Sequence, residues 1–515
     1  ATSATASSMV ADWAVTLGAA RVRIPLLLAS AVLLMAAYPT TDWSLFAWVA
    51  LVPLFASALV RSPRQALADG WLMGTVFFLL LLRWLDHTFR HYSAIPWPVT
   101  WLPILGLAAY CGLYFGLVAA LVSWLRSRLG AGWALAAAPF LWVTAEWLRG
   151  WVLSGFPWGL LGYSQYRQLA LIWIAAMTGV YGVSFMIASA NAVLAAVMAL
   201  GWQGARRGLI ATAALLVVTL VLGDFAGRGP IKPVTIDVAV VQPSIEQSLK
   251  WDPAYQKETL RIYTDLTREA GRRKPAMIVW PETAAPIFLR RDPALVAELR
   301  ALSAEVNAPL LVGSLDGGGR GFYNSAFLLE RQGIRAKYDK MHLVPFGEYV
   351  PLSGIIGFVR RWAEFISEFQ AGRVPKVFKE ADPPFGVVIC YEGIFPELFR
   401  EFVAGGAVYM MNITNDAWFG TTSGPWQHLA MLPFRAVEHQ VSIVRAANTG
   451  VSAFVWPNGY ITKTLGLFER GVLSDRIVVN PSGGTFYTRF GDLFAYLCLA
   501  VSAAGCLFAR LRRSH

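Results

Sequence analysis

Hydrophobic residues form long runs at both ends of the chain and short runs in its middle. A helix that crosses a membrane needs about 20 mostly apolar residues. The expected spans are Ile24–Tyr38, Trp43–Val60, Ala66–Leu85, Trp101–Leu125, Trp133–Leu148, Leu169–Leu200, Leu209–Gly223 and Leu493–Ala509. The first run could pass for a signal-peptide core, but six further runs before residue 225 favour an uncleaved anchor. We therefore predict eight spans: seven in residues 24–225, after a tail of residues 1–23, and one in residues 491–515.

The middle of the chain, residues 226–490, has the pattern of an α/β domain. Short apolar or alternating runs predict strands, and longer amphipathic runs predict helices. The expected strands are Val234–Gln242, Ala276–Trp280, Leu310–Ser314, Ser325–Leu329, Phe385–Cys390, Ala407–Asn412, Ile443–Ala447 and Ser452–Trp456. The expected helices are Pro253–Ala270, Pro293–Val306 and Trp426–Gln440, and Val344–Gly372 is expected to be a loop excursion. This alternation predicts a sheet covered by helices.

Composition and charge support this division and orient the chain. Hydrophobic residues make up 56% of the sequence, and all nine lysines lie between Lys232 and Lys463. If the spans alternate, arginines concentrate on one side of the membrane, at Arg21/Arg23, Arg61/Arg64, Arg126/Arg128, Arg206/Arg207 and Arg510/Arg512/Arg513. The positive-inside rule places that side, with both termini, in the cytoplasm, so the domain Asp224–Asp492 is expected outside it. This bias accounts for most of the net charge of +12, and the sequence has no basic stripe with interleaved aromatics for nucleic acid.

Two pairs of residues stand out within the expected spans. Glu146 and Arg149 lie in or beside a span, where charged groups are costly unless they are paired or face a cavity. We expect them to form a structural pair. Gly112 and Gly116 have the spacing of a helix-packing contact and indicate nothing beyond formation of a bundle.

One cysteine lies apart from the other three. Cys390 ends an apolar run of the middle domain, whereas Cys111, Cys498 and Cys506 lie in expected spans. Between a strand and a helix that starts at Ile394, backbone N–H groups and the helix dipole would favour its thiolate. A lone cysteine is usually an inert core residue, but an unpaired thiol in an oxidising compartment is a liability unless it is used. The core and nucleophile interpretations both remain open from this stretch alone.

Two other segments end in groups that suit a nucleophilic thiol. Glu282 follows one expected strand, and Lys340 follows a further strand region. Reactive groups gather at the carboxyl ends of strands in open α/β sheets. A thiol nucleophile needs a base for its proton and a cation for developing charge, and Glu and Lys supply both without histidine. Singly, Glu282 could be a strand-end cap and Lys340 a surface charge, so the spacing alone remains only suggestive.

Together these segments resemble the Glu–Lys–Cys triad of the nitrilase superfamily. The matching segments are Trp-Pro-Glu282, the stretch around Lys340 and Cys390-Tyr-Glu. Nearly the whole chain resembles the integral inner-membrane branch of that superfamily, the apolipoprotein N-acyltransferases. More specific stretches than the triad are Leu148–Trp158, Gln247–Asp252, His342–Glu348 and Asn415–Gly420. The resemblance implies a multi-span α-helical membrane domain and an exported α/β domain with the αββα nitrilase-like sandwich.

The resemblance also implies a two-step acyl transfer in the bacterial inner membrane. A phospholipid would give a fatty acyl chain to Cys390 as a thioester, and the free amino terminus of a diacylglyceryl-cysteine apolipoprotein would then receive it. Glu282 would be the general base, and Lys340 would stabilise the tetrahedral oxyanion. The residues expected to support the site are Glu348, Tyr391 and Glu392. Trp251 and Trp418 are expected to contact lipid, with ordinary packing as the alternative.

Two other functions would use a similar fold. A membrane-anchored amide or nitrile hydrolase would transfer to water, but one anchor would suffice for it. A receptor with a degenerate nitrilase-like domain would be expected to lose a triad residue, and this chain keeps all three. The sequence has no metal-ligand spacing and no phosphate-binding glycine loop, so we expect no metal and no cofactor. The expected partners are a phospholipid donor, a diacylglyceryl-modified apolipoprotein and membrane lipids, with no nucleic acid, and the chain is expected to act as a monomer.

Overall fold

The computed structural model describes residues 18–93, 95–227, 234–250, 252–318, 321–349, 369–479 and 484–512. The chain divides into two compact units. A helical unit comprises Ala1–Arg83, Val99–Gly229 and Phe490–His515, and a second unit comprises Trp84–Pro98 and Pro230–Arg489. The assignment of Trp84–Pro98 to the second unit was not anticipated from the sequence, because this segment lies between two of the expected spans.

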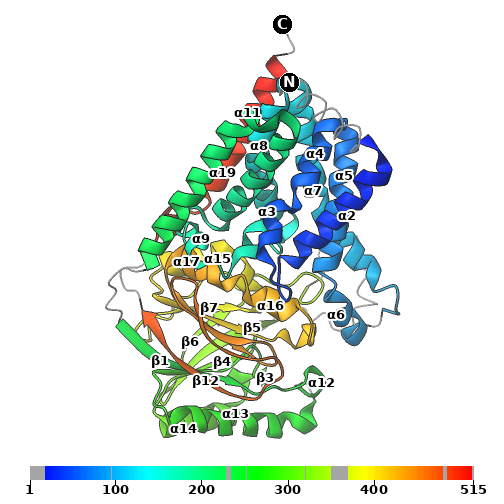
Figure 1. Ribbon diagram of the computed structural model, residues 1–515. Coiled ribbons are helices and arrows are strands. Elements are labelled where there is room, and N and C mark those ends of the chain that lie inside the picture. Colours follow the sequence, from blue (N-terminus) through cyan, green and yellow to red (C-terminus); the bar gives the residue numbers. More distant parts are fainter. Residues whose placement is uncertain are drawn as a thin grey trace, which may run out of the picture. The chain divides into compact units, whose positions relative to one another are not determined.

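The helical unit has helices at all of the expected spans, and α11 covers most of the sixth and the whole of the seventh (Figure 1). Its main helices are α2 (Ala20–Ala36), α3 (Ala47–Ala50), α4 (Val52–Val60), α5 (Pro63–Leu81), α7 (Trp101–Leu129), α8 (Ala131–Trp151), α9 (Leu169–Ile172), α10 (Ala175–Thr178), α11 (Val180–Gly227) and α19 (Leu493–Leu511). The expected span Leu169–Leu200 is not one continuous helix, because Gly179 adopts a φ of 64° between α10 and α11. Helix α11 is interrupted at Gly201, whose φ of 66° only glycine adopts freely.

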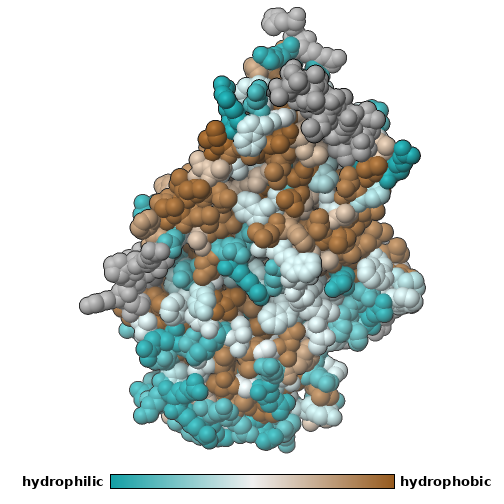
Figure 2. Space-filling model, in the orientation of Figure 1, coloured by the Kyte–Doolittle hydropathy of each residue, from teal (hydrophilic) through white to brown (hydrophobic). Residues whose placement is uncertain are grey.

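Three described helices are long and apolar enough to cross a membrane by length and composition alone: Trp101–Leu129, Val180–Phe225 and Leu493–Leu511. The number is four if Pro63–Leu81 and Leu85–Tyr92 count as one bent span. Large apolar side chains are exposed on these helices, including Ile210, at 67% exposure, and Leu497. The surface over the region of these helices in Figure 1 is largely coloured as hydrophobic in the space-filling view (Figure 2). The eight-span topology itself stays a prediction.

Glycines let α5 and α7 approach closely. A Cβ added at Gly112 would lie 2.5 Å from the main-chain nitrogen of Thr75, and one at Gly116 would lie 2.7 Å from the carbonyl oxygen of Leu67. Neither distance is physically tolerable, so these positions require glycine. The helix-packing role expected of Gly112 and Gly116 is therefore confirmed.

The buried charges of α8 do not form the expected pair. No ion pair joins the described side chains of Glu146 and Arg149. Instead, Arg149 donates to the carbonyl oxygens of Phe156 and Trp158, at 2.7 Å each. Glu146 accepts from the main-chain N–H of Leu161 at 2.6 Å. Each charge thus satisfies backbone groups of the irregular segment after α8, where helical hydrogen bonds are lacking.

The second unit contains two β-sheets. Their strands are β1 (Val234–Gln242), β2 (Met277–Val279), β3 (Ala285–Phe288), β4 (Leu310–Gly318), β5 (Gly321–Glu330), β6 (Gly333–Asp339), β7 (Gly386–Ile389), β8 (Tyr409–Thr414), β9 (Ser442–Ala447), β10 (Ser452–Val455), β11 (Ile461–Leu465) and β12 (Gly471–Val479). The described strands of one sheet run in the order β12-β1-β2-β4-β5-β6, with β3 also paired to β4. The other sheet runs β11-β10-β9-β8-β7.

Helices α13 (Gln256–Gly271) and α14 (Pro293–Val306) pack on one sheet, and α15 (Pro396–Ala404) and α17 (Leu432–His439) pack on the other. The same unit contains α6 (Leu85–Tyr92), α12 (Gln247–Lys250), α16 (Gly424–Leu429) and most of α18 (Phe486–Phe490). One core cluster joins the inner faces of the sheets to α15 and α17, and another joins the first sheet to α13 and α14 (Figure 1). The layers are therefore helix, sheet, sheet, helix, the αββα arrangement expected.

Most of the expected middle-domain elements are confirmed. Strand β1 and helix α14 have the expected bounds, and each of the other expected strands overlaps an observed one by several residues. The expected helix Trp426–Gln440 is split into α16 and α17. Strands β3, β11 and β12 were not predicted. No residue of β11 is fully buried, and in β12 only the last three residues are. Most of the expected loop Val344–Gly372 lies outside the described residues.

Candidate active site

Glu282 is held in place by its own loop and by two amide groups. The loop follows β2, and Gly313 of β4 makes room for it: a Cβ there would lie 2.2 Å from the carbonyl oxygen of Pro281. The Glu282 carboxylate is 6% exposed. Its Oε1 accepts from the side-chain amide of Asn324 at 2.7 Å, and its Oε2 accepts from the main-chain N–H of Asn415 at 2.8 Å. Both oxygens are therefore oriented by donors from other strands.

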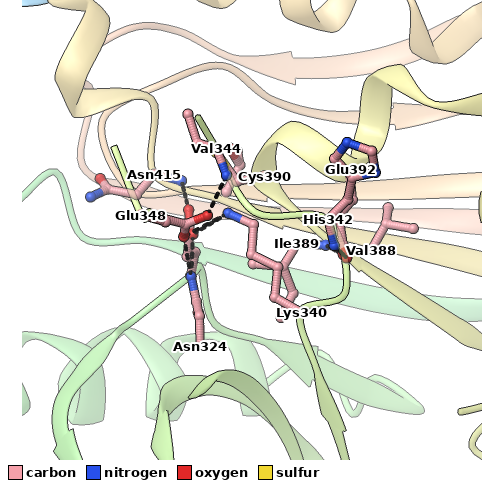
Figure 3. Close-up of polar contacts among 12 residues, drawn as sticks. Asn324, Lys340, His342, Val344, Glu348, Val388, Ile389, Cys390, Glu392 and Asn415 are labelled. Carbon is pink, nitrogen blue, oxygen red and sulfur yellow. Dashed lines mark hydrogen bonds and ion pairs between the residues drawn. The ribbon is translucent and has the colours of Figure 1, made fainter. Parts of the chain in front are cut away.

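Lys340 lies between two carboxylates, directly after β6. Its ammonium is buried and donates to Glu348 Oε1 at 2.9 Å (Figure 3). The same ammonium lies 3.6 Å from Glu282 Oε1. Glu348 is fixed in turn by the main-chain N–H of Val344, which donates to its Oε2 at 2.8 Å. Burial by itself would lower the pKa of the Lys340 ammonium, but the carboxylates of Glu348 and Glu282 raise it above its ordinary value. Lys340 is therefore a permanent cation.

Cys390 forms a strained elbow between β7 and a short 3-10 turn, Cys390–Ile394. Its φ is +52°, a conformation that non-glycine residues rarely adopt and that usually marks a functional site. Cys390 is 9% exposed, and both Glu282 and Lys340 influence its thiol electrostatically. Helix α15 starts only at Pro396, two residues later than expected, because the 3-10 turn intervenes.

The structure does not favour a resting thiolate at Cys390, contrary to our expectation from the strand–helix position. Burial raises the pKa of the Cys390 thiol well above its ordinary value, and the Glu282 carboxylate raises it further. Lys340 opposes this shift without cancelling it. The thiol is thus protonated at rest, so a base must remove its proton as the sulfur attacks.

Glu392 joins the Cys390 elbow to the segment that carries Lys340. Its side chain is completely buried and accepts from the main-chain N–H groups of Ile389 at 2.7 Å, Met341 at 2.6 Å and His342 at 3.0 Å. It also accepts from the hydroxyl of Tyr338 at 2.8 Å. Burial raises the pKa of Glu392 to about 7. Four donors on one carboxylate make it a rigid connection between the two segments.

The aromatic residues expected at the site have different surroundings. The Tyr391 ring lies 5.1 Å from that of Phe395 and 6.0 Å from that of His342. The Trp418 ring packs edge-on against Tyr92, 4.8 Å away, and its carbonyl oxygen accepts from the Thr88 hydroxyl at 2.8 Å. Trp418 thus packs on α6, a contact the sequence did not indicate. Trp251 lies outside the described residues.

Sequence reasoning missed three polar residues of the site. Asn324 donates to Glu282 and, at 3.3 Å, to Glu348, and it comes from the buried part of β5. Asn415 directs its main-chain N–H at Glu282. Lys250, at the end of α12, is 3% exposed and donates to the carbonyl oxygen of Glu282 at 3.0 Å. A polar residue inside an otherwise apolar strand could have indicated Asn324, and Asn415 and Lys250 lie within stretches already noted for their resemblance.

A buried polar cluster of Arg445, Asp416 and His428 contacts the backbone of Cys390. Arg445 donates to Asp416 at 2.5 Å and to Nδ1 of His428 at 3.1 Å. Burial, together with Arg445, lowers the pKa of the His428 imidazole, whose Nδ1 also lies 3.2 Å from Asp416 Oδ1. We assign a hydrogen to Nε2 because this nitrogen faces a carbonyl oxygen, which can only accept. That nitrogen lies 3.2 Å from the carbonyl oxygen of Cys390. His428 therefore contacts the backbone of Cys390.

The arrangement suits acyl transfer through a thioester. A thiol, a carboxylate and an ammonium converge from loops after β7, β2 and β6, which provides a nucleophile, a base and a cation for an oxyanion. Among the described residues, no group of three or more His, Cys, Asp or Glu side chains is arranged to hold a metal ion.

Both units match families of known proteins. Residues 30–193 match the family model of the apolipoprotein N-acyltransferase N-terminal domain, and residues 237–481 match that of carbon-nitrogen hydrolase. The chain is 38% identical to an apolipoprotein N-acyltransferase of Geobacter metallireducens, covering 94% of this chain and 95% of the relative. It is 32% identical to one of Haemophilus ducreyi, covering 89% and 90%. A solved amidase from Nesterenkonia sp. is 22% identical and covers 52% of this chain and 94% of its own, with a TM-score of 0.37.

Proposed function

Because the chain belongs to the apolipoprotein N-acyltransferase family, we propose that it moves a fatty acyl chain from a phospholipid to the amino terminus of a diacylglyceryl-cysteine apolipoprotein. The observation that supports this most directly is the contact of Lys340 with both Glu282 and Glu348 beside the Cys390 elbow. The long apolar helices suit substrates that are themselves lipids. Among the three functions considered, only the acyltransferase uses both the triad and a multi-span membrane domain.

In the first step, the Cys390 sulfur attacks the ester carbonyl carbon of the phospholipid while its proton passes to Glu282. The negative charge that develops on the carbonyl oxygen is stabilised by Lys340. When the tetrahedral intermediate collapses, the carbon–oxygen bond breaks and the leaving lysophospholipid takes the proton from Glu282. The acyl chain remains on Cys390 as a thioester.

In the second step, the neutral amine of the apolipoprotein attacks the thioester carbon. Glu282 accepts a proton from the amine, and Lys340 again faces the oxyanion. The intermediate expels the Cys390 sulfur, which regains a proton from Glu282, and an amide forms. Atoms and charges balance over the two steps, and no cofactor is needed.

The first prediction tests the order of these steps. With phospholipid alone, the purified protein should gain one acyl chain on Cys390 and release lysophospholipid in a stoichiometric burst, measured by intact mass and lipid analysis. The thioester should persist, because a transferase must exclude water until its second substrate arrives. A diacylglyceryl-cysteinyl peptide with a free amino terminus should then remove it as an amide.

A peptide of the same sequence with a blocked amino terminus is the matched control and should leave the thioester in place. Continuous release of free fatty acid without acceptor would instead indicate the hydrolase. If lysophospholipid appeared only when both substrates were present, the two-step scheme would be wrong.

We further propose that residues 226–490 form a periplasmic domain and that both termini are cytoplasmic. The arginine distribution supports this orientation. In intact spheroplasts, an impermeant maleimide should label Lys463→Cys in the second unit and should not label Arg206→Cys on α11, both of which replace exposed residues. After membrane disruption both should react. Labelling of position 206 alone in intact spheroplasts would reverse the orientation.

A further inference from the structure

Lys250 is a buried cation to which the two-step scheme gives no role. Its side chain is 3% exposed, and its ammonium donates to the main-chain carbonyl oxygen of Glu282 at 3.0 Å. In the described part of the chain, no carboxylate forms an ion pair with it. Burying an ammonium without a carboxylate partner is costly, so a charge that persists there has to be balanced by another group.

Among Glu282, Glu348, Lys340 and the reacting groups, one negative charge has no partner. Glu282 and Glu348 supply two carboxylates, since Glu282 must enter the reaction ionised to act as a base. Lys340 supplies one ammonium, and its shorter contact is with Glu348, at 2.9 Å against 3.6 Å for Glu282. The remaining negative charge belongs to the reacting groups. It starts on Glu282, passes to the sulfur when the proton moves, and then reaches the carbonyl oxygen of the intermediate.

We infer that Lys250 is the counter-cation of this migrating negative charge, a positioning residue that stabilises the ionised form of Glu282 and then of the Cys390 sulfur. The inference rests on the proposed roles of Glu282 and Cys390. Lys250 suits this task because it is anchored to the backbone of Glu282 and not to its carboxylate. The ammonium therefore stays in place when the proton moves.

The protonation of Lys250 gives this inference a specific signature. Burial lowers the pKa of Lys250 to about 8, and the charged groups that oppose this shift are Glu282, on the loop after β2, and Cys390, at the elbow after β7. The ammonium is protonated below that pH and neutral above it. The ammonium should thus stabilise the Cys390 thiolate near neutral pH, and this stabilisation should disappear as the pH rises through about 8.

The test is the rate of Cys390 alkylation by iodoacetamide in the full-length protein in detergent, followed by mass spectrometry of the peptide that contains Cys390. Lys250→Gln keeps a donor for the Glu282 carbonyl but removes the charge, and Lys250→Arg keeps both. Lys257→Gln removes an exposed lysine from α13 and is the control. Below about pH 7, the rate for Lys250→Gln should be about tenfold lower than wild type, the change that one pKa unit produces.

The pH profiles separate a charge effect from a structural one. Wild type and Lys250→Gln should converge above about pH 9 as the wild-type lysine loses its proton, whereas Lys250→Arg should keep its full rate advantage there. Equal rates for Lys250→Gln and wild type near neutrality, a deficit of the same size at every pH, or an arginine variant as slow as the glutamine variant would each overturn the inference.

If a variant does not fold, the pH profile of alkylation in the wild-type protein still tests the inference. A plot of the logarithm of the alkylation rate against pH that keeps a constant slope through pH 8 would contradict it. Iodoacetamide alkylation needs no lipid. A failure here is therefore distinct from a failure of the proposed function, which would appear as the absence of a thioester with phospholipid.

Discussion

Replacing Cys390 with serine should abolish formation of the acyl-enzyme. A serine hydroxyl has a far higher pKa than a thiol, and the site already raises the pKa of the group at this position by burial. His428 contacts the backbone carbonyl oxygen of Cys390, and the base proposed for the thiol is Glu282. We expect Cys390→Ser to lower the rate of acyl transfer by about 10⁴-fold or more, as loss of a nucleophile does in other covalent enzymes.

Intact mass after incubation with phospholipid checks this prediction. Wild type should gain one acyl chain and Cys390→Ser none, while thermal unfolding of the two proteins should be similar because the side chains have nearly the same shape. Cys506→Ser changes a partly exposed cysteine of α19 and should behave like wild type. An acyl adduct of normal yield in Cys390→Ser would place the nucleophile elsewhere.

Replacing Glu282 with glutamine should stop the first step while leaving the fold in place. Because the Cys390 thiol is protonated at rest, the reaction depends on a base, and an amide cannot accept the proton. General-base catalysis is worth about 10²–10⁴-fold, so the lysophospholipid burst should slow by that factor. Stability should also fall by about 1–3 kcal/mol, because the single amide oxygen cannot accept from both Asn324 and Asn415.

Rapid quenching of the burst measures this rate, and denaturant unfolding measures the stability. Glu305→Gln removes an exposed carboxylate that pairs with Arg268 and is the matched control, expected to match wild type in the burst. A normal burst rate in Glu282→Gln would remove Glu282 from the role of base, whatever its effect on stability.

Local patterns in the sequence were enough for most of the elements and for the strand-end positions of Glu282, Lys340 and Cys390. Apolar runs predicted the helices of the first unit, and strand ends predicted the positions of Glu282 and Cys390. Both features are encoded within a few neighbouring residues, since burial of a helix or strand requires a recognisable pattern of apolar positions. The sequence analysis did not predict strands β3, β11 and β12 or the place of Trp84–Pro98. In β11 and in the first six residues of β12 no residue is fully buried, so their pattern of apolar positions is weak.

Only the tertiary structure shows which contacts hold Glu282 in place and which groups of the site are protonated. Asn324, Asn415 and Lys250 reach Glu282 from three distant segments, and no local pattern records that convergence. The protonation state of Cys390 was also not evident from the sequence. Its position between a strand and a helix led us to expect a thiolate, but burial and the Glu282 carboxylate raise the pKa of the thiol. The sequence by itself determined which groups end which strands, because that depends on near neighbours. Burial and charge pairing depend on residues far apart in the chain, and they determine which of these groups holds the proton.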